Sequence, residues 1–179
     1  MPMNRRKVWP LLAAASLLAA PVFAGSDIAA KGAELLLPFK QDMKAALVEG
    51  LAAGPAAAID ACRVEAPQIA GKYSTDGVKI GRTSHRLRNP ANAGPDWVTP
   101  TLERWLADAD AREPVVVELD GERVGYVEPI VTQPMCLACH GETLSPAVAD
   151  SIERLYPGDR ATGFAAGDLR GVFWVEFTP

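Results

Sequence analysis

The segment PVVVELDGERVGYVEPIV, residues 114–131, determines the fold class that we predict for this chain. Its first part, 114–119, is rich in β-branched residues, which is typical of a strand. Asp120-Gly121 is a strong signal for a two-residue hairpin turn, and 123–131 returns as the partner strand. The sequence therefore predicts an antiparallel pair, which favours an α+β fold over a parallel α/β fold.

The elements on either side of this hairpin complete the predicted architecture. N-terminal helices come first, and a central antiparallel sheet with inserted helices follows. On the N-terminal side we predict a helix over 27–51 capped by Ser26, a helix over 55–71, an extended run over 79–88, a loop over 92–100 and a helix over 101–112. On the C-terminal side we predict a helical turn at 136–140, a helix over 146–155 and a last strand over 169–177.

The first 24 residues have the features of a secretory signal peptide. A basic start at 5–7 precedes an apolar stretch over 8–20, and 21–24 offers small residues to a signal peptidase. An uncleaved membrane anchor is the alternative, but the apolar run falls short of the roughly 20 residues that cross a bilayer. We therefore expect cleavage after Ala24, a single domain over 25–179, no remaining membrane span, and a periplasmic or secreted location.

Cleavage would make the chain more acidic, because residues 1–24 hold three basic residues and no acidic ones. The remaining chain has 15 Lys and Arg residues against 22 Asp and Glu residues, a net charge of −7. Nucleic-acid phosphates would repel such a chain. We therefore expect no nucleic-acid partner.

Three cysteines are an odd number for a secreted protein, in which cysteines usually pair. The segment Cys136-Leu137-Ala138-Cys139-His140 accounts for two of them. Two thiols separated by two residues can add to the two vinyl groups of haem, and the histidine that follows can bind the iron. We therefore predict one covalently attached haem c, with Cys136 and Cys139 as the attachment points and His140 as an iron ligand.

Two other chemistries use a pair of cysteines with this spacing. A redox-active disulfide usually opens a helix after a strand in a thioredoxin-like βαβ unit, a pattern this sequence lacks. A structural zinc site needs four Cys or His ligands, and beyond the motif the mature chain offers only Cys62 and His85. Haem therefore explains the motif better than a disulfide or zinc.

The face of the iron opposite His140 has three candidate ligands, Cys62, His85 and Met43. Met135 is too close to the motif to reach that face. Cys62 falls in the middle of the buried face predicted for the second helix. His85 falls on the apolar side of the alternating run 79–88. A buried thiol can also be a core filler, and a buried histidine can simply bond to backbone. The residues by themselves therefore leave Cys62 and His85 equally placed.

Three arginines, Arg82, Arg86 and Arg88, lie on the opposite side of the same extended run. Arginine pairs bidentately with carboxylates, so these side chains could hold the haem propionates. An ordinary solvated strand face explains them equally well.

Five stretches, one of which contains the cysteine motif, follow one another in order along nearly the whole mature chain. They are 58–70 (AIDACRVEAPQIA), 81–84 (GRTS) with 88–92 (RNPAN), 126–130 (YVEPI), 136–141 (CLACHG), and 163–164 (GF) with 167–171 (GDLRG). In these stretches the chain resembles the PAS-like c-type haem domains. Such domains occur as single-domain periplasmic proteins and as the sensing portions of histidine kinases.

The resemblance implies a PAS-like fold in which the haem is held against a central antiparallel sheet. It also implies that the iron ligands are His140 and the thiolate of Cys62 from an upstream helix. His85 departs from the family pattern, because an apolar residue is expected there. Imidazole could therefore compete with the thiolate when the iron changes its redox state.

The function that follows is low-potential electron transfer to a separate redox partner, because thiolate ligation lowers the potential of haem iron. The alternative is a haem-based sensor of redox state, nitric oxide or carbon monoxide, in which Cys62 dissociates and a separate partner receives the signal. A peroxidase would need an open iron position and a distal acid–base group. Since Cys62 would block that position, we do not expect an enzyme.

Overall fold

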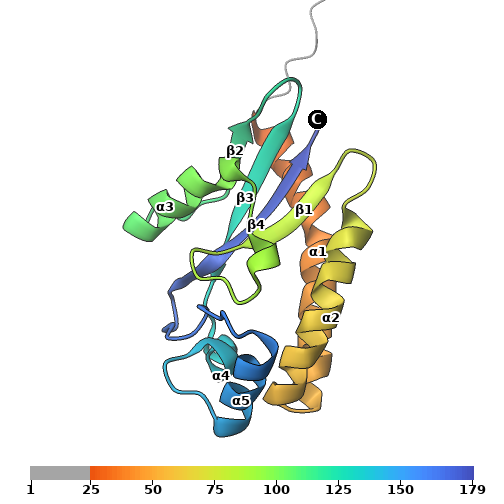
Figure 1. The fold of residues 1–179 in the computed structure, drawn as a ribbon. Helices are drawn as coiled ribbons and strands as arrows, with labels where there is room; N and C mark the ends of the chain where they lie inside the picture. Colours follow the sequence, from red (N-terminus) through yellow and green to blue (C-terminus); the bar gives the residue numbers. More distant parts are fainter. Residues whose placement is uncertain (1–24) are drawn as a thin grey trace, which may run out of the picture.

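The fold, a computed structural model that describes residues 25–179, is built on a four-stranded antiparallel sheet in the order β1-β4-β3-β2. The predicted signal peptide, 1–24, lies outside the described residues. Helices α1 and α2 lie along one face of the sheet, and α3 lies on the other (Figure 1). The helices are α1 (Gly25–Ala52), α2 (Pro55–Tyr73), α3 (Thr99–Ala107), α4 (Leu137–His140) and α5 (Pro146–Leu155), with 3₁₀ turns η1 (Pro90–Asn92), η2 (Asp96–Val98) and η3 (Pro134–Cys136). The strands are β1 (Lys79–Thr83), β2 (Val115–Glu118), β3 (Val124–Val131) and β4 (Leu169–Phe177).

The predicted α+β class and the antiparallel pairing of the central hairpin are confirmed, but the turn is wider than predicted. The register pairs Glu118 with Val124, and the Leu119 amide donates to the Arg123 carbonyl at 3.1 Å. The turn is therefore centred on Gly121, whose φ of 73° lies in the left-handed region that glycine adopts without steric cost. The last strand, β4, pairs with both β1 and β3 and occupies the middle of the sheet.

Alternating side chains of the strands build two separate cores. The core beneath α1 contains Leu36, Phe39, Met43, Tyr126, Val175 and Phe177. The core beneath α3 contains Val98, Leu102, Trp105, Val127 and Val172. Each fully buried large side chain contributes about 1.5–3 kcal/mol relative to exposure, so both faces of the sheet help to stabilise the fold.

The long helices lie where their patterns predicted them. The helix predicted over 27–51 runs from Gly25, so Ser26 lies inside α1 and does not cap it. The helix predicted over 101–112 ends earlier, at Ala107. There the Asp108 carboxylate accepts a hydrogen bond from the Asp110 amide at 2.9 Å, a local turn that competes with further helix. Within residues 25–179, no helix is long and apolar enough to cross a membrane.

The extended run predicted over 79–88 is wrong beyond Thr83, where β1 ends. The Ser84 hydroxyl donates to the Arg170 carbonyl at 2.6 Å and accepts from the Arg86 amide at 3.1 Å. These bonds bend the backbone away from the strand, so the alternation of faces that placed His85 toward the sheet core no longer applies.

The contact between α1 and β3 depends on Gly32. A Cβ at this position would lie 2.4 Å from Cγ of Tyr126, which is part of the core. Gly32→Ala is therefore expected to lower the free energy of unfolding by about 1–3 kcal/mol, as overpacking of a core does. Gly71→Ala is the matched control, because a Cβ there meets nothing within 4 Å and alanine favours helix by up to about 1 kcal/mol. Urea denaturation tests the pair, and equal stabilisation by both changes would contradict this packing.

Candidate functional site

A cavity of about 470 Å³ lies between the α1–α2 hairpin, the sheet and the turn that holds the cysteine motif. Its size is within the roughly 300–1,000 Å³ of typical small-molecule and cofactor sites. Both helices and the sheet contribute apolar lining, including Leu47, Leu51, Ile59, Ile130 and Phe173. The cavity is therefore suited to a large, mostly apolar organic group.

The motif forms one continuous turn, η3 followed by α4, as predicted. Pro134 begins the turn with its φ already set, and the Gln133 amide points at the Cys136 sulfur at 3.4 Å. Residues three and four apart share one side of a helical turn. Cys136, Cys139 and His140 accordingly all line the cavity, and both thiols are free.

A small core fastens this turn to the N-terminal helices. Ile59 of α2 packs with Val148 and Ile152 of α5, and Cys139 lies against this cluster. The Cys139 sulfur also approaches the Pro55 carbonyl at 3.9 Å. The motif is thus held against α2, although some 80 residues separate the two in the sequence.

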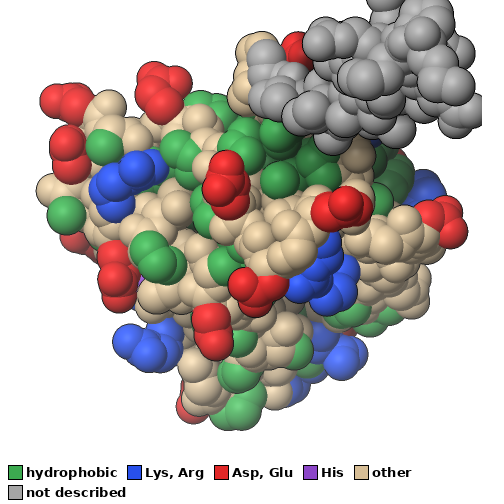
Figure 2. All heavy atoms as spheres, turned by 90° about the horizontal axis from the view of Figure 1, so that it is seen from above, with side chains coloured by type: hydrophobic (Ala, Val, Ile, Leu, Met, Phe, Trp, Pro, Cys, Tyr) green, Lys and Arg blue, Asp and Glu red, His purple; other side chains and the backbone are tan. Residues whose placement is uncertain are grey.

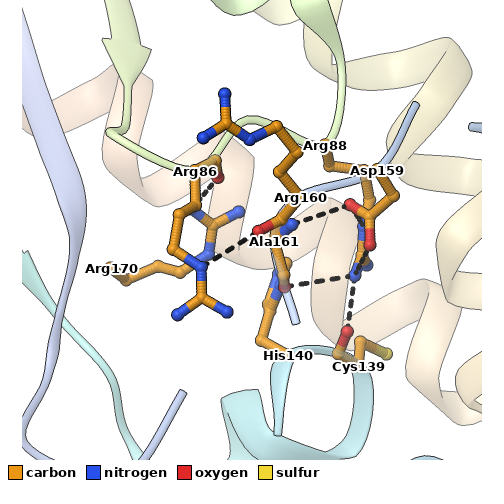
Figure 3. Close-up of polar contacts among 8 residues, drawn as sticks. All are labelled: Arg86, Arg88, Cys139, His140, Asp159, Arg160, Ala161 and Arg170. Carbon is orange, nitrogen blue, oxygen red and sulfur yellow. Dashed lines mark hydrogen bonds and ion pairs between the residues drawn. The ribbon is translucent and has the colours of Figure 1, made fainter. Parts of the chain in front are cut away.

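His140 is held as a neutral imidazole with one nitrogen available. Its Nδ1 lies 2.6 Å from the Ala161 carbonyl oxygen (Figure 3). Because a carbonyl can only accept, Nδ1 carries the proton and Nε2 keeps its lone pair. Burial, with added repulsion from Arg170 and Arg88, lowers the pKa of His140 to about 3. This is the tautomer and charge state in which histidine binds metals.

Cys62 lines the same cavity from α2, half-buried, on the face predicted for it. Burial raises the pKa of its thiol, while the positive charges of Arg82 and Arg88 act in the opposite direction. Coordination to a metal ion deprotonates a thiol outright. Cys62 is therefore placed as a sulfur donor on a different element from His140.

His85 does not line the cavity, so its predicted orientation is wrong. With β1 ended at Thr83, the His85 ring packs edge-on against Phe164 at a centroid distance of 5.7 Å. Met43 lines the cavity from α1, and Met135, which we expected to be too close to the motif, lines it as well. Of the two residues that the sequence left equally placed, Cys62 lines the cavity and His85 does not.

The three arginines that the predicted extended run placed on one side do not all face the cavity. Arg82 and Arg88 line the cavity, whereas Arg86 does not. The Arg86 guanidinium lies 4.3 Å from the centre of the Phe164 ring and donates to the Arg160 carbonyl. The bend after β1 turns Arg86 away from Arg82.

Arg88 ties the motif to a distant loop (Figure 3). Its guanidinium forms an ion pair with Asp159 at 3.0 Å and donates to the Cys139 carbonyl at 2.6 Å. It also reaches, at 3.4 Å, the Ala161 carbonyl that accepts from His140. Arg88 and Asp159 therefore orient the turn that carries Cys139 and His140.

Arg170 lines the cavity and was missed by the sequence analysis. Its Nε is buried without a hydrogen-bond partner, and burial, with repulsion from Arg82 and Arg88, lowers its pKa to about 10. The available signal was a charged residue, one of two with Glu176, inside a mostly apolar strand, LRGVFWVEF.

The described residues contain no cluster of three or more His, Cys, Asp or Glu side chains able to hold a bare metal ion. Cys62, Cys136, Cys139 and His140 all line the cavity, but they do not converge into the four-ligand cluster of a structural zinc site. A metal held here would have to bring further ligands of its own, as the iron of haem does with its porphyrin. The donor set, the apolar lining and the buried arginines all fit haem, whose two propionates are carboxylates.

Comparison with known proteins identifies a family and a similar solved structure. The family model described as "Tll0287-like: Tll0287" matches residues 22–178. This chain belongs to the Tll0287-like family. The crystal structure of the cyanobacterial haem protein Tll0287 is similar, with a TM-score of 0.55 and 28% sequence identity over 66% of this chain and 71% of that one. No curated protein sequence matches the chain significantly.

The match to the Tll0287-like family includes every residue of the candidate site, from Lys40 on α1 to Phe173 on β4. The site therefore lies within the part of the chain that the family model describes and not in an added segment.

Proposed function

We propose that this Tll0287-like chain is a c-type haem protein that binds one haem in the cavity. The observation that carries the proposal is that Cys62, Cys136, Cys139 and His140, from distant parts of the chain, line one cavity. The similarity to the structure of a cyanobacterial haem protein supports it. The PAS-like framing and the periplasmic or secreted location are parts of the same proposal.

Each of the four residues has a distinct role in this proposal. Cys136 and Cys139 would hold the haem through thioether bonds to its two vinyl groups. His140 would bind the iron through Nε2, with its ring held by the bond from Nδ1 to the Ala161 carbonyl. Cys62 would supply a thiolate from α2. When bound, haem supplies one-electron redox chemistry.

The function we favour is low-potential electron transfer with a separate redox partner. Ligation by both His140 and Cys62 would leave no open position on the iron, and outer-sphere electron transfer requires none. A thiolate ligand donates electron density to iron and lowers its potential. The same argument leads us to propose that the chain is not an enzyme.

A haem-based sensor of redox state, nitric oxide or carbon monoxide is the second candidate, and the position of Cys62 favours it. Cys62 lies on α2, an element separate from the turn that carries Cys136, Cys139 and His140. If Cys62 left the iron, α2 could therefore move and present a changed surface to a partner.

Absorption and electron paramagnetic resonance spectra of the ferric and dithionite-reduced holoprotein test the proposal. The ferric wild type is expected to be low-spin with thiolate character, and Cys62→Ala is expected to lose that character. His85→Ala is the matched control and is expected to leave the spectrum unchanged, because His85 lies outside the cavity. The assignment of Cys62 as the sulfur ligand would be contradicted if Cys62→Ala kept the wild-type spectrum. It would also be contradicted if His85→Ala lost the thiolate character.

Carbon monoxide separates the two candidate functions. Electron transfer predicts no binding in either oxidation state. Sensing predicts that the ferrous form binds carbon monoxide with loss of the sulfur ligand.

A further inference from the structure

The charged residues around the cavity are all of one sign. Five cations line it, namely Lys40, Lys44, Arg82, Arg88 and Arg170, and no Asp or Glu does. This is notable in a chain with 22 acidic and 18 basic residues. On the face seen in Figure 2, by contrast, acidic and basic side chains are interspersed. The cavity is therefore locally electropositive within an acidic protein.

Two of these cations already have carboxylate partners outside the cavity lining. Lys40 is paired with Glu128, and Arg88 with Asp159. Within residues 25–179, neither Arg82 nor Arg170 forms an ion pair with an acidic side chain. The buried Nε of Arg170 also lacks any hydrogen-bond acceptor. Lys44, the remaining cation, is exposed to solvent. Arg170 donates one hydrogen bond to the Arg86 carbonyl at 3.4 Å and lies over the Phe164 ring, but neither contact supplies a negative charge. Arg82 and Arg170 are thus the partly buried cations of the cavity that have no carboxylate partner.

The sheet brings these two arginines to the same end of the cavity. Arg82 of β1 pairs in register with Phe173 of β4, and both line the cavity. Arg170 precedes Phe173 on β4, and its carbonyl accepts a hydrogen bond from the Ser84 hydroxyl just beyond the end of β1. Two partly buried like charges so close together are costly unless an anion lies between or beside them.

We infer that Arg82 and Arg170 form a carboxylate-binding site that selects a dicarboxylate porphyrin and places its carboxylate edge at the β1–β4 end of the cavity. This rests on the proposed haem function and names the residues that determine its ligand specificity. Arg86 is excluded from the site, and the Nε and Nη2 groups of Arg88 are already bonded to Asp159, Cys139 and Ala161.

Binding of two porphyrins to the full chain, produced without haem, tests the inference. The probes are iron protoporphyrin IX and its dimethyl ester, in which both carboxylates are neutral. Wild type is expected to bind the acid about 10- to 100-fold more tightly, the factor that a charged hydrogen bond of about 1.5–3 kcal/mol supplies. Arg82→Gln and Arg170→Gln are each expected to reduce this ratio, and the double variant to remove it.

Arg86→Gln is the matched control and is expected to keep the full ratio. Equal affinity of wild type for the acid and the ester would overturn the inference while leaving the haem proposal intact. The same holds if Arg86→Gln reduces the acid-to-ester affinity ratio as much as Arg82→Gln and Arg170→Gln do. Failure of both porphyrins to bind wild type would instead overturn the haem proposal and the inference with it.

Thermal unfolding of the haem-free chain gives a second readout. Arg82 forms no ion pair within residues 25–179, so Arg82→Gln removes an uncompensated charge and is expected to raise the melting temperature of the haem-free chain. A lower melting temperature of this variant would count against the carboxylate site.

Discussion

With Cys136 and Cys139 both changed to serine, all of the haem is expected to leave the protein on extraction with acidified acetone. The wild type is expected to keep all of it in the protein precipitate. Both thiols are free and line the cavity from one helical turn, so each can form a thioether with the same group. A hydroxyl cannot replace the thiol in this attachment, so only non-covalent contacts would hold the haem in the variant.

The third cysteine is the matched control for this experiment. Cys62 lines the same cavity but lies on α2, outside the attachment motif. Cys62→Ser is therefore expected to change the spectrum of the ferric protein and yet retain its haem through the extraction. Retention in the Cys136→Ser, Cys139→Ser variant would show that the motif does not attach the group.

Asp159→Ala is expected to lower the free energy of unfolding by about 3–5 kcal/mol, the effect of removing one partner of a buried ion pair. The Arg88 and Asp159 side chains are only 12% and 7% exposed. Without Asp159, Arg88 would remain buried near two further cations, Arg82 and Arg170, which also line the cavity. Urea denaturation of wild type and variant measures the change.

Two comparisons make this stability experiment specific. Glu34→Ala removes an exposed ion pair, in which the Glu34 and Lys31 side chains are 71% and 50% exposed. This change is expected to alter the free energy of unfolding by no more than about 1 kcal/mol. The double variant Arg88→Met, Asp159→Ala removes both charges and is expected to be more stable than Asp159→Ala alone. If the single and double variants were equally unstable, the stabilisation would come from packing and not from the paired charges.

Most helices and strands could be predicted because their signals are local. The helices over 55–73 and 146–155 and the strand over 169–177 follow from periodicity and from their flanking turn residues. The position of Cys62 on the cavity-facing side of α2 follows from the same periodicity. Local bonds caused the errors, since the Ser84 hydroxyl ends β1 early and the Asp108 carboxylate ends α3 early.

The sequence by itself determined the α+β class and the helical turn at Cys136-Leu137-Ala138-Cys139-His140, because each depends on residues within a few positions of one another. Only the tertiary structure showed that Cys62 lines the cavity and His85 does not, and that Arg170 lines it and Arg86 does not. It alone also joined Arg88 to Asp159, 71 residues away. The physical reason is that these outcomes depend on which strands are neighbours in the sheet. The pairing of β1 with β4 is a contact between distant segments that no local pattern encodes.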